Sequence, residues 1–316
     1  MNPIIKLHQE YCNYKIAFKG CSKTTLRGEF YIIVPFVRHL ELNSFEEFKE
    51  LERQDIINYI IKRKKESDWS ARTIKNNLQA LSNFFEYCKQ NNLVDKNPVE
   101  GIEKPKPPKN LPRLVKKEDA LRILEWLYFV EFRYKGERER AKAIVGTFIF
   151  TGVRRSELLN IKNSDINFRE KVIRINSGKG NKDRVIPMND KLIEILKEYV
   201  QCDLKKNCKS AYFFVKLDGE NKMGDSTIRA LFERFKKELK IDVSPHKLRH
   251  TFATLMAQSA CSMPALAKMM GHSTIKTTEV YLWLDTDSIR SEIQKHPFGY
   301  IDGLPHGTHR SNYNGW

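Results

Sequence analysis

The feature that most constrains this chain is a proline-rich stretch at residues 105–113, which reads PKPPKNLPR. Four of its first eight residues are proline, and proline lacks the amide proton that a helix interior or a central strand needs. We therefore expect an extended spacer here. Because 316 residues suffice for two ordinary domains, the stretch predicts a domain at 1–104, a linker at 105–113, a second domain at 114–300 and a tail at 301–316 whose composition favours disorder.

The first domain has the pattern of a purely helical unit. Serines that can cap helices stand before apolar residues that recur every three or four positions. The expected helices span Ile5–Phe18, Thr25–Leu40, Ser44–Gln54, Gln54–Glu66 and Ser70–Asn91. The outer face of the last helix carries Arg72, Lys75 and Asn76 beside Trp69, and we expect Arg72 and Lys75 to contact DNA phosphates or a groove. A merely solvated face is the alternative.

The second domain has a mixed pattern. β-branched runs at Lys171–Ile175 and Arg184–Ile186 flank a glycine-rich turn and predict a hairpin, with Asp165–Phe168 as a third strand. The turn lacks the Gly-x-x-x-x-Gly-Lys-Ser/Thr pattern of a P-loop and precedes a strand, so we reject a nucleotide site. Helices are expected at 117–134, 137–151, 189–201 and 225–239, and a buried strand or apolar run at 211–215. The predicted class is mainly α with a small antiparallel β-sheet (α+β).

The formal charge of +17 indicates a polyanionic partner. Residues 1–104 carry 17 basic against 14 acidic side chains, so the excess lies in the linker and second domain. Charge alone also suits a ribosomal protein or a binder of membrane surfaces. The chain has no run of about 18 apolar residues and no signal-peptide pattern at its start, so we expect a cytoplasmic protein without a membrane partner.

The stretch from Ser244 to Leu282 concentrates the residues that bear chemistry. Ser244 and Pro245 begin a helix expected to reach Gln258, and it presents His246 and Arg249 on one side. A second helix ends at the cap Gly271, which leaves His272 on a turn, and a third carries Tyr281. Taken singly, these are ordinary surface or packing residues, and the helix pair also resembles a helix-turn-helix that binds DNA without chemistry.

The combination of motifs resembles the tyrosine recombinase (phage integrase, Xer-type) family. His246-Lys-Leu-Arg249, Gly271-His272 and Tyr281 match the family's His-x-x-Arg, Gly-His and nucleophilic Tyr. Residues 151–158, TGVRRSEL, match the first catalytic-arginine box and select Arg154 over its neighbour. Residues 178–184, GKGNKDR, match the turn that bears the catalytic lysine, which maps to Lys179. Lys182 and Arg184 are then expected as phosphate contacts or surface charges.

This resemblance implies a helical, SAM-like core-binding domain and a mixed catalytic domain. It implies cleavage and rejoining of double-stranded DNA through a 3′-phosphotyrosyl intermediate, with no metal or other cofactor, and a homo-oligomer on DNA, a dimer per site and a tetramer in the synapse, joined by a C-terminal helix near 285–295. Both a Xer-like recombinase and a mobile-element integrase remain open. The rivals are a type IB topoisomerase, which shares the chemistry, and a DNA-binding protein without activity.

Overall fold

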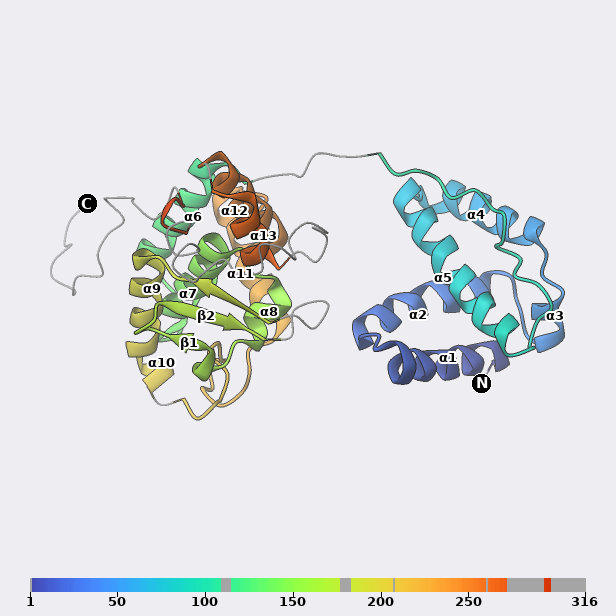
Figure 1. The fold of residues 1–316 in the computed structure, drawn as a ribbon, viewed down its shortest axis with the longest axis horizontal. Coiled ribbons are helices and arrows are strands. Elements are labelled where there is room, and N and C mark those ends of the chain that lie inside the picture. Colours follow the sequence, from blue (N-terminus) through green and yellow to red (C-terminus); the bar gives the residue numbers. More distant parts are fainter. Residues whose placement is uncertain are drawn as a thin grey trace. The chain divides into compact units, whose positions relative to one another are not determined.

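The chain divides into two compact units, Met1–Leu111 and Pro112–Trp316 (Figure 1). The computed structural model describes residues 2–108, 115–176, 183–206, 208–259, 261–271 and 293–296. The division falls inside the proline-rich stretch, where the sequence predicts a linker. Each unit has its own hydrophobic core.

The first unit contains helices alone within its described residues, in agreement with the pattern of its sequence. They are α1 (Pro3–Lys19), α2 (Lys23–His39), α3 (Phe45–Lys49), α4 (Arg53–Ser67) and α5 (Ala71–Gln90). Serines begin three of them, since the hydroxyls of Ser22, Ser44 and Ser70 each accept a hydrogen bond from an amide in the first turn. The apolar stripe of α5 forms the centre of the core, where Phe85 stacks on Phe48 at 4.7 Å between ring centroids.

The second unit is built around α7 (Glu137–Thr151), which is buried from Arg140 to Thr151. A helix that is buried on every side must be covered by other elements. α6 (Lys117–Phe129), α9 (Asp190–Gln201) and α12 (Pro245–Gln258) pack against it. Because α7 is enclosed in this way, its C-terminal end is a rigid base for the segment that follows.

A three-stranded antiparallel sheet completes this unit, in the order β1 (Ile166–Asn167), β2 (Val172–Ile175) and β3 (Arg184–Pro187) (Figure 1). Val172 pairs with Pro187 and Ile175 with Arg184. The inward side chains of Ile173, Ile175 and Ile186 enter the core. The predicted hairpin and the predicted class, mainly α with a small antiparallel sheet, are confirmed.

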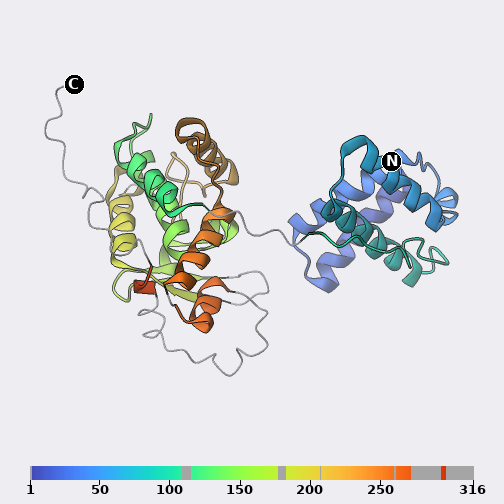
Figure 2. The same cartoon turned by 90° about the horizontal axis from the view of Figure 1, so that it is seen from above.

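The shorter elements are α8 (Arg155–Asn160), η1 (Asn163–Asp165), α10 (Asp203–Lys206), α11 (Asp225–Leu239) and α13 (Met263–Met270). Figure 2 shows α12 and α13 side by side in the second unit, and the two helices contact each other. Among the described residues, no helix combines the length and apolar character needed to cross a bilayer.

The structure shortens one predicted helix and decides between two alternatives for another segment. The helix expected at 117–134 ends at Phe129, because the Phe132 ring packs on Trp126 and the carbonyl of Glu131 accepts a hydrogen bond from Arg234 of α11. Residues 211–215 form isolated bridges outside the sheet, Lys162 with Tyr212 and Val215 with Lys222. Because Phe213 and Phe214 are buried, this segment is the apolar run of the two predicted alternatives. Tertiary contacts, which periodicity does not encode, decide both cases.

Candidate active site

Arg154 is positioned by the turn that ends α7. Gly152 caps the helix at φ +60°, in the left-handed region, and Val153 is fully buried. Arg154 then stands directly before α8, and its amide donates a 2.7 Å hydrogen bond to Glu157 Oε2. Its side chain is 27% exposed, which leaves part of the guanidinium accessible. This placement at a helix start is the one expected for a residue that grips a phosphate.

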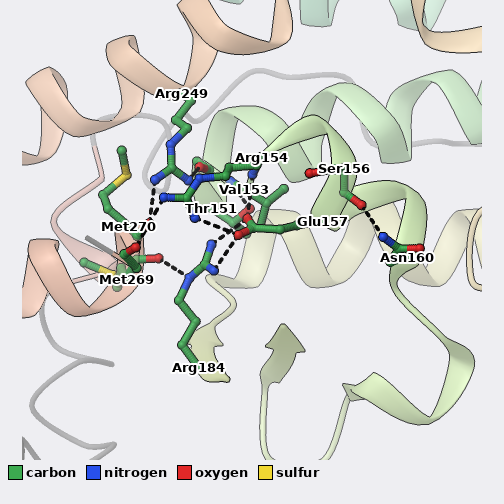
Figure 3. Close-up of polar contacts among 12 residues, drawn as sticks. Thr151, Val153, Arg154, Ser156, Glu157, Asn160, Arg184, Arg249, Met269 and Met270 are labelled. Atoms are coloured by element: carbon green, nitrogen blue, oxygen red, sulfur yellow. Dashed lines mark hydrogen bonds and ion pairs between the residues drawn. The ribbon is translucent and has the colours of Figure 1, made fainter. Parts of the chain in front are cut away.

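Glu157 is the buried acceptor at the centre of the site, and the sequence interpretation assigned it no role. Its carboxylate receives Arg154 Nη1 at 2.8 Å and both terminal nitrogens of Arg184, at 2.8 and 2.7 Å (Figure 3). Burial by itself would raise the pKa of Glu157, but the hydrogen bonds and charge of Arg184 and the bonds from Arg154 lower it to about 2. The group is therefore ionised at neutral pH. Two signals were available: its place in the arginine box at residues 151–158, and its position three residues after Arg154, as in a capping box.

Arg249 enters the same cluster from α12. Its Nη1 donates to the carbonyl of Gly152 at 2.6 Å and its Nη2 to the carbonyl of Met270 (Figure 3). Burial and the neighbouring charge of Arg154 lower the pKa of Arg249 to about 10. It still carries a proton at neutral pH. Two guanidiniums from elements far apart in the sequence thus stand together, as the two arginine motifs predict.

Arg184 lies elsewhere than expected. The sequence interpretation placed it among the phosphate contacts or surface charges, yet its side chain is only 5% exposed. Besides its two bonds to Glu157, its Nε donates to the carbonyl of Met269 at 2.7 Å. All three nitrogens of its guanidinium donate hydrogen bonds to protein groups, so this arginine is part of the buried structure that supports the site.

Comparison with known proteins identifies the chain. Residues 117–287 match the model of the phage integrase family, and residues 5–95 match the SAM-like N-terminal domain of phage integrases. The chain belongs to the phage integrase family. It is a site-specific DNA recombinase of the tyrosine type, as its motifs predict.

Similar sequences span nearly the whole recombinase. It is 30% identical to the tyrosine recombinase of Thermosipho africanus, over 78% of this chain and 81% of that one. It is also 28% identical to the tyrosine recombinase XerA of Pyrococcus horikoshii, over 91% and 92% of the two chains.

Two kinds of solved structure share its fold. The XerH site-specific recombinase bound to palindromic difH substrate gives a TM-score of 0.67 at 21% identity, over 87% of this chain and 81% of that chain. The Tn1549 transposon integrase in complex with circular intermediate DNA gives 0.64 at 19% identity, over 93% and 99%.

His246 of the recombinase lies on α12 three residues before Arg249, so both project from the same side of the helix. It is exposed, and its Nε2 lies 2.9 Å from Nε2 of His250, so that one ring donates and the other accepts. Burial, together with the charges of His246 and Arg249, lowers the pKa of His250. His250 is a neighbour that the sequence interpretation left without a role.

The other predicted site residues divide between the two units and the undescribed segments. Arg72 and Lys75 are exposed on α5 of the first unit, three residues apart and therefore on one face. The expected catalytic residues Lys179, His272 and Tyr281 and the expected phosphate contact Lys182 lie outside the described residues. Within the described residues, no cluster of three or more histidine, cysteine, aspartate or glutamate side chains is arranged to hold a metal ion.

Proposed function

We propose that this recombinase cleaves and rejoins DNA strands through a 3′-phosphotyrosyl intermediate on Tyr281. The observation that supports this most directly is the pair formed by Arg154 and Arg249. Arg154 donates to the carbonyl of Gly271 at 3.2 Å, and Arg249 to the preceding carbonyl of Met270, so the two guanidiniums are adjacent (Figure 3). Adjacent guanidiniums supply the charge-assisted donors that the non-bridging oxygens of a scissile phosphate require.

The two arginines keep their charge through the reaction. A phosphodiester is an anion, and more charge gathers on its non-bridging oxygens as a nucleophile attacks. Guanidinium is a fixed cation that donates bidentately, and the pKa of Arg249, about 10, leaves it protonated at neutral pH. In this proposal Arg154 and Arg249 stabilise the transition state, while the storage of bond energy in the phosphotyrosyl link removes the need for ATP.

The remaining proposed roles concern the two protons that must move during strand cleavage. The phenol of Tyr281, with an ordinary pKa of about 10, must lose its proton as its oxygen attacks phosphorus. His246 takes that proton or binds the phosphate, and Lys179 gives a proton to the departing 5′-oxygen. His272 donates a hydrogen bond to the phosphoryl group. These steps balance charge without a metal ion, because the two guanidiniums stabilise the phosphoryl oxygens and Lys179 neutralises the leaving group.

Double-stranded DNA is the proposed substrate of both units. The net charge of +17, the exposed Arg72 and Lys75 on α5, and the DNA present in the XerH and Tn1549 integrase structures all support it. We take Lys182 as a further phosphate contact and assign no such contact to the buried Arg184. A DNA substrate also favours a cytoplasmic location, and the relatives include both Xer recombinases and a transposon integrase.

We infer that the protein acts as a homo-oligomer on DNA, with a dimer at each site and a tetramer in the synapse. Most of the C-terminal helix expected near 285–295 lies outside the described residues, but residues 293–296 pack against the catalytic domain of the same chain. Ile293 is fully buried in a cluster with Phe252 and Met256, and His296 stacks on Phe252 at 5.6 Å between ring centroids. A neighbouring protomer offers the same pocket, so an exchange of this segment between protomers costs little packing.

A suicide substrate tests the proposal. A duplex nicked next to the cleavage site loses the short strand after attack, so that the covalent protein–DNA adduct accumulates. We expect an adduct with the wild type and none with Tyr281→Phe, which keeps the ring but removes the nucleophile. A protein that only binds DNA forms no adduct with either chain. Relaxation of supercoiled plasmids that lack the target site would indicate a topoisomerase instead.

A further inference from the structure

We propose that Arg184 is a positioning residue for strand cleavage: it holds Glu157 and the end of α13 so that Arg154 and Arg249 face the scissile phosphate. This inference rests on the proposed function. Arg184 is the first residue of β3, directly after the turn that contains Lys179 in the sequence. It does not touch DNA in this proposal, since its side chain is 5% exposed against 27% for Arg154.

The first observation is the way the carboxylate of Glu157 is shared. Arg184 occupies both oxygens with a bidentate pair at 2.8 and 2.7 Å, while the Arg154 side chain donates only Nη1. A guanidinium has five N–H donors. Arg154 uses one on Glu157 and one on the Gly271 carbonyl, and so keeps three for a phosphate. Without Arg184, the buried carboxylate would draw Arg154 into a bidentate pair and cancel its charge.

The second observation is the end of α13, where three successive carbonyls each accept from a different arginine. Met269 accepts from Arg184, Met270 from Arg249 and Gly271 from Arg154 (Figure 3). The last carbonyls of a helix have no partner within the helix and form the negative end of its dipole. The carbonyls at the end of α13 therefore hold the three guanidiniums side by side. Arg184, as the first residue of β3, links the end of this helix to the sheet.

Gly271 makes this close approach possible. Its φ of +60° suits glycine, and a Cβ atom placed there would lie 3.0 Å from Nη1 of Arg184. The guanidinium thus fills the space beside the glycine at the point where the chain leaves α13 toward His272. Arg184 therefore joins three parts of the site: α8 through Glu157, the end of α13, and the hairpin.

The experiment is a double-mutant cycle on adduct formation in a single turnover. Arg184→Lys keeps the charge but loses the bidentate fork. We expect it to slow adduct formation by about 100-fold and to change the DNA dissociation constant by less than about threefold. In an Arg154→Lys background the same change should slow the reaction by less than about threefold, because Arg184 acts through Arg154. Arg155→Lys, which alters an exposed arginine paired with Asp225, is the matched control and should react like the wild type.

Two results would overturn the inference: adduct formation by Arg184→Lys close to the wild-type rate, or losses from Arg154→Lys and Arg184→Lys that simply multiply. If thermal unfolding shows that Arg184→Lys does not fold, Arg184→Gln, which keeps an N–H donor near the charged Glu157, replaces it in the same cycle with the same expected losses. An adduct with Tyr281→Phe, or none with the wild type, would instead count against the proposed function and leave the geometry of Arg184 untouched.

Discussion

Gly152 joins α7 to the turn that carries Arg154, in a conformation that suits glycine. Gly152→Ala therefore tests how tightly the surroundings of Arg154 and Arg249 are packed. The residue has φ +60°, and its carbonyl accepts the hydrogen bond from Arg249 Nη1. A Cβ atom added there would lie 2.5 Å from Cδ1 of Phe252 and 3.2 Å from the sulfur of Met270. Both neighbours belong to a buried cluster, so neither ring nor thioether has open space to enter.

Two costs add in this variant. A left-handed conformation costs an L-residue about 1–2 kcal/mol. Forcing an extra methyl into a packed core costs about 1–3 kcal/mol more. We therefore expect Gly152→Ala to lower the free energy of unfolding of the catalytic domain by about 2–5 kcal/mol. The added methyl group also displaces the Gly152 carbonyl, which accepts the hydrogen bond from Arg249. The rate of adduct formation should therefore fall as well.

Gly219→Ala separates the two costs. Gly219 has φ +69°, also in the left-handed region, but the nearest atom to its added Cβ is the Leu204 carbonyl oxygen at 3.5 Å, an ordinary contact. This variant should lose only the backbone contribution of about 1–2 kcal/mol. Native-state hydrogen exchange of the full chain, followed in peptides of α7, measures the free energy of unfolding of both variants. Equal losses in the two variants would refute the packing argument at Gly152.

Three further predictions concern charge. Arg249→Ala should reduce adduct formation by at least about 100-fold, because the transition state loses one of its two guanidiniums. Duplex binding should weaken only a few-fold, because one phosphate contact of many is lost. Wild-type-like cleavage in the suicide-substrate assay would contradict this prediction. The pKa of Glu157 falls from its ordinary 4.5 to about 2 on folding, so its charge stabilises the fold by about 3 kcal/mol above pH ~4.5, and this contribution disappears as pH falls toward 2. The stability gap between the wild type and Glu157→Gln in urea titrations should shrink over that range, and a gap independent of pH would show that the network contributes little. DNA binding should weaken by about 10³-fold or more from ~50 to ~200 mM salt, and a flat salt response in fluorescence anisotropy would argue against phosphate contacts.

The sequence predicted the elements well where local signals are strong. Capping serines and apolar periodicity placed the helices of the first unit and α7, α11 and α12 within a few residues. The hairpin was predictable because β-branched runs flank a glycine-rich turn. The end of α6 was not, since Phe132 and the carbonyl of Glu131 meet partners on other elements.

The chemistry of the site was only partly predictable. Arg154 and Arg249 were recognisable because each lies in a short motif with fixed spacing. The role of Arg184 was not, because an arginine after a basic turn has the same local pattern whether it faces solvent or a buried carboxylate. Its contacts to Glu157 and Met269 lie 27 and 85 residues away along the chain.

The amino-acid order alone determined most helix boundaries, the net positive charge and the motif residues, since these depend on composition or on neighbours within a few positions. Tertiary structure alone decided which arginine stays partly exposed and which is buried against Glu157. That choice depends on burial: the Arg184 guanidinium is enclosed where α8, β3 and α13 converge, while that of Arg154 stays partly open to solvent. Desolvation and partner geometry arise only when distant segments pack together.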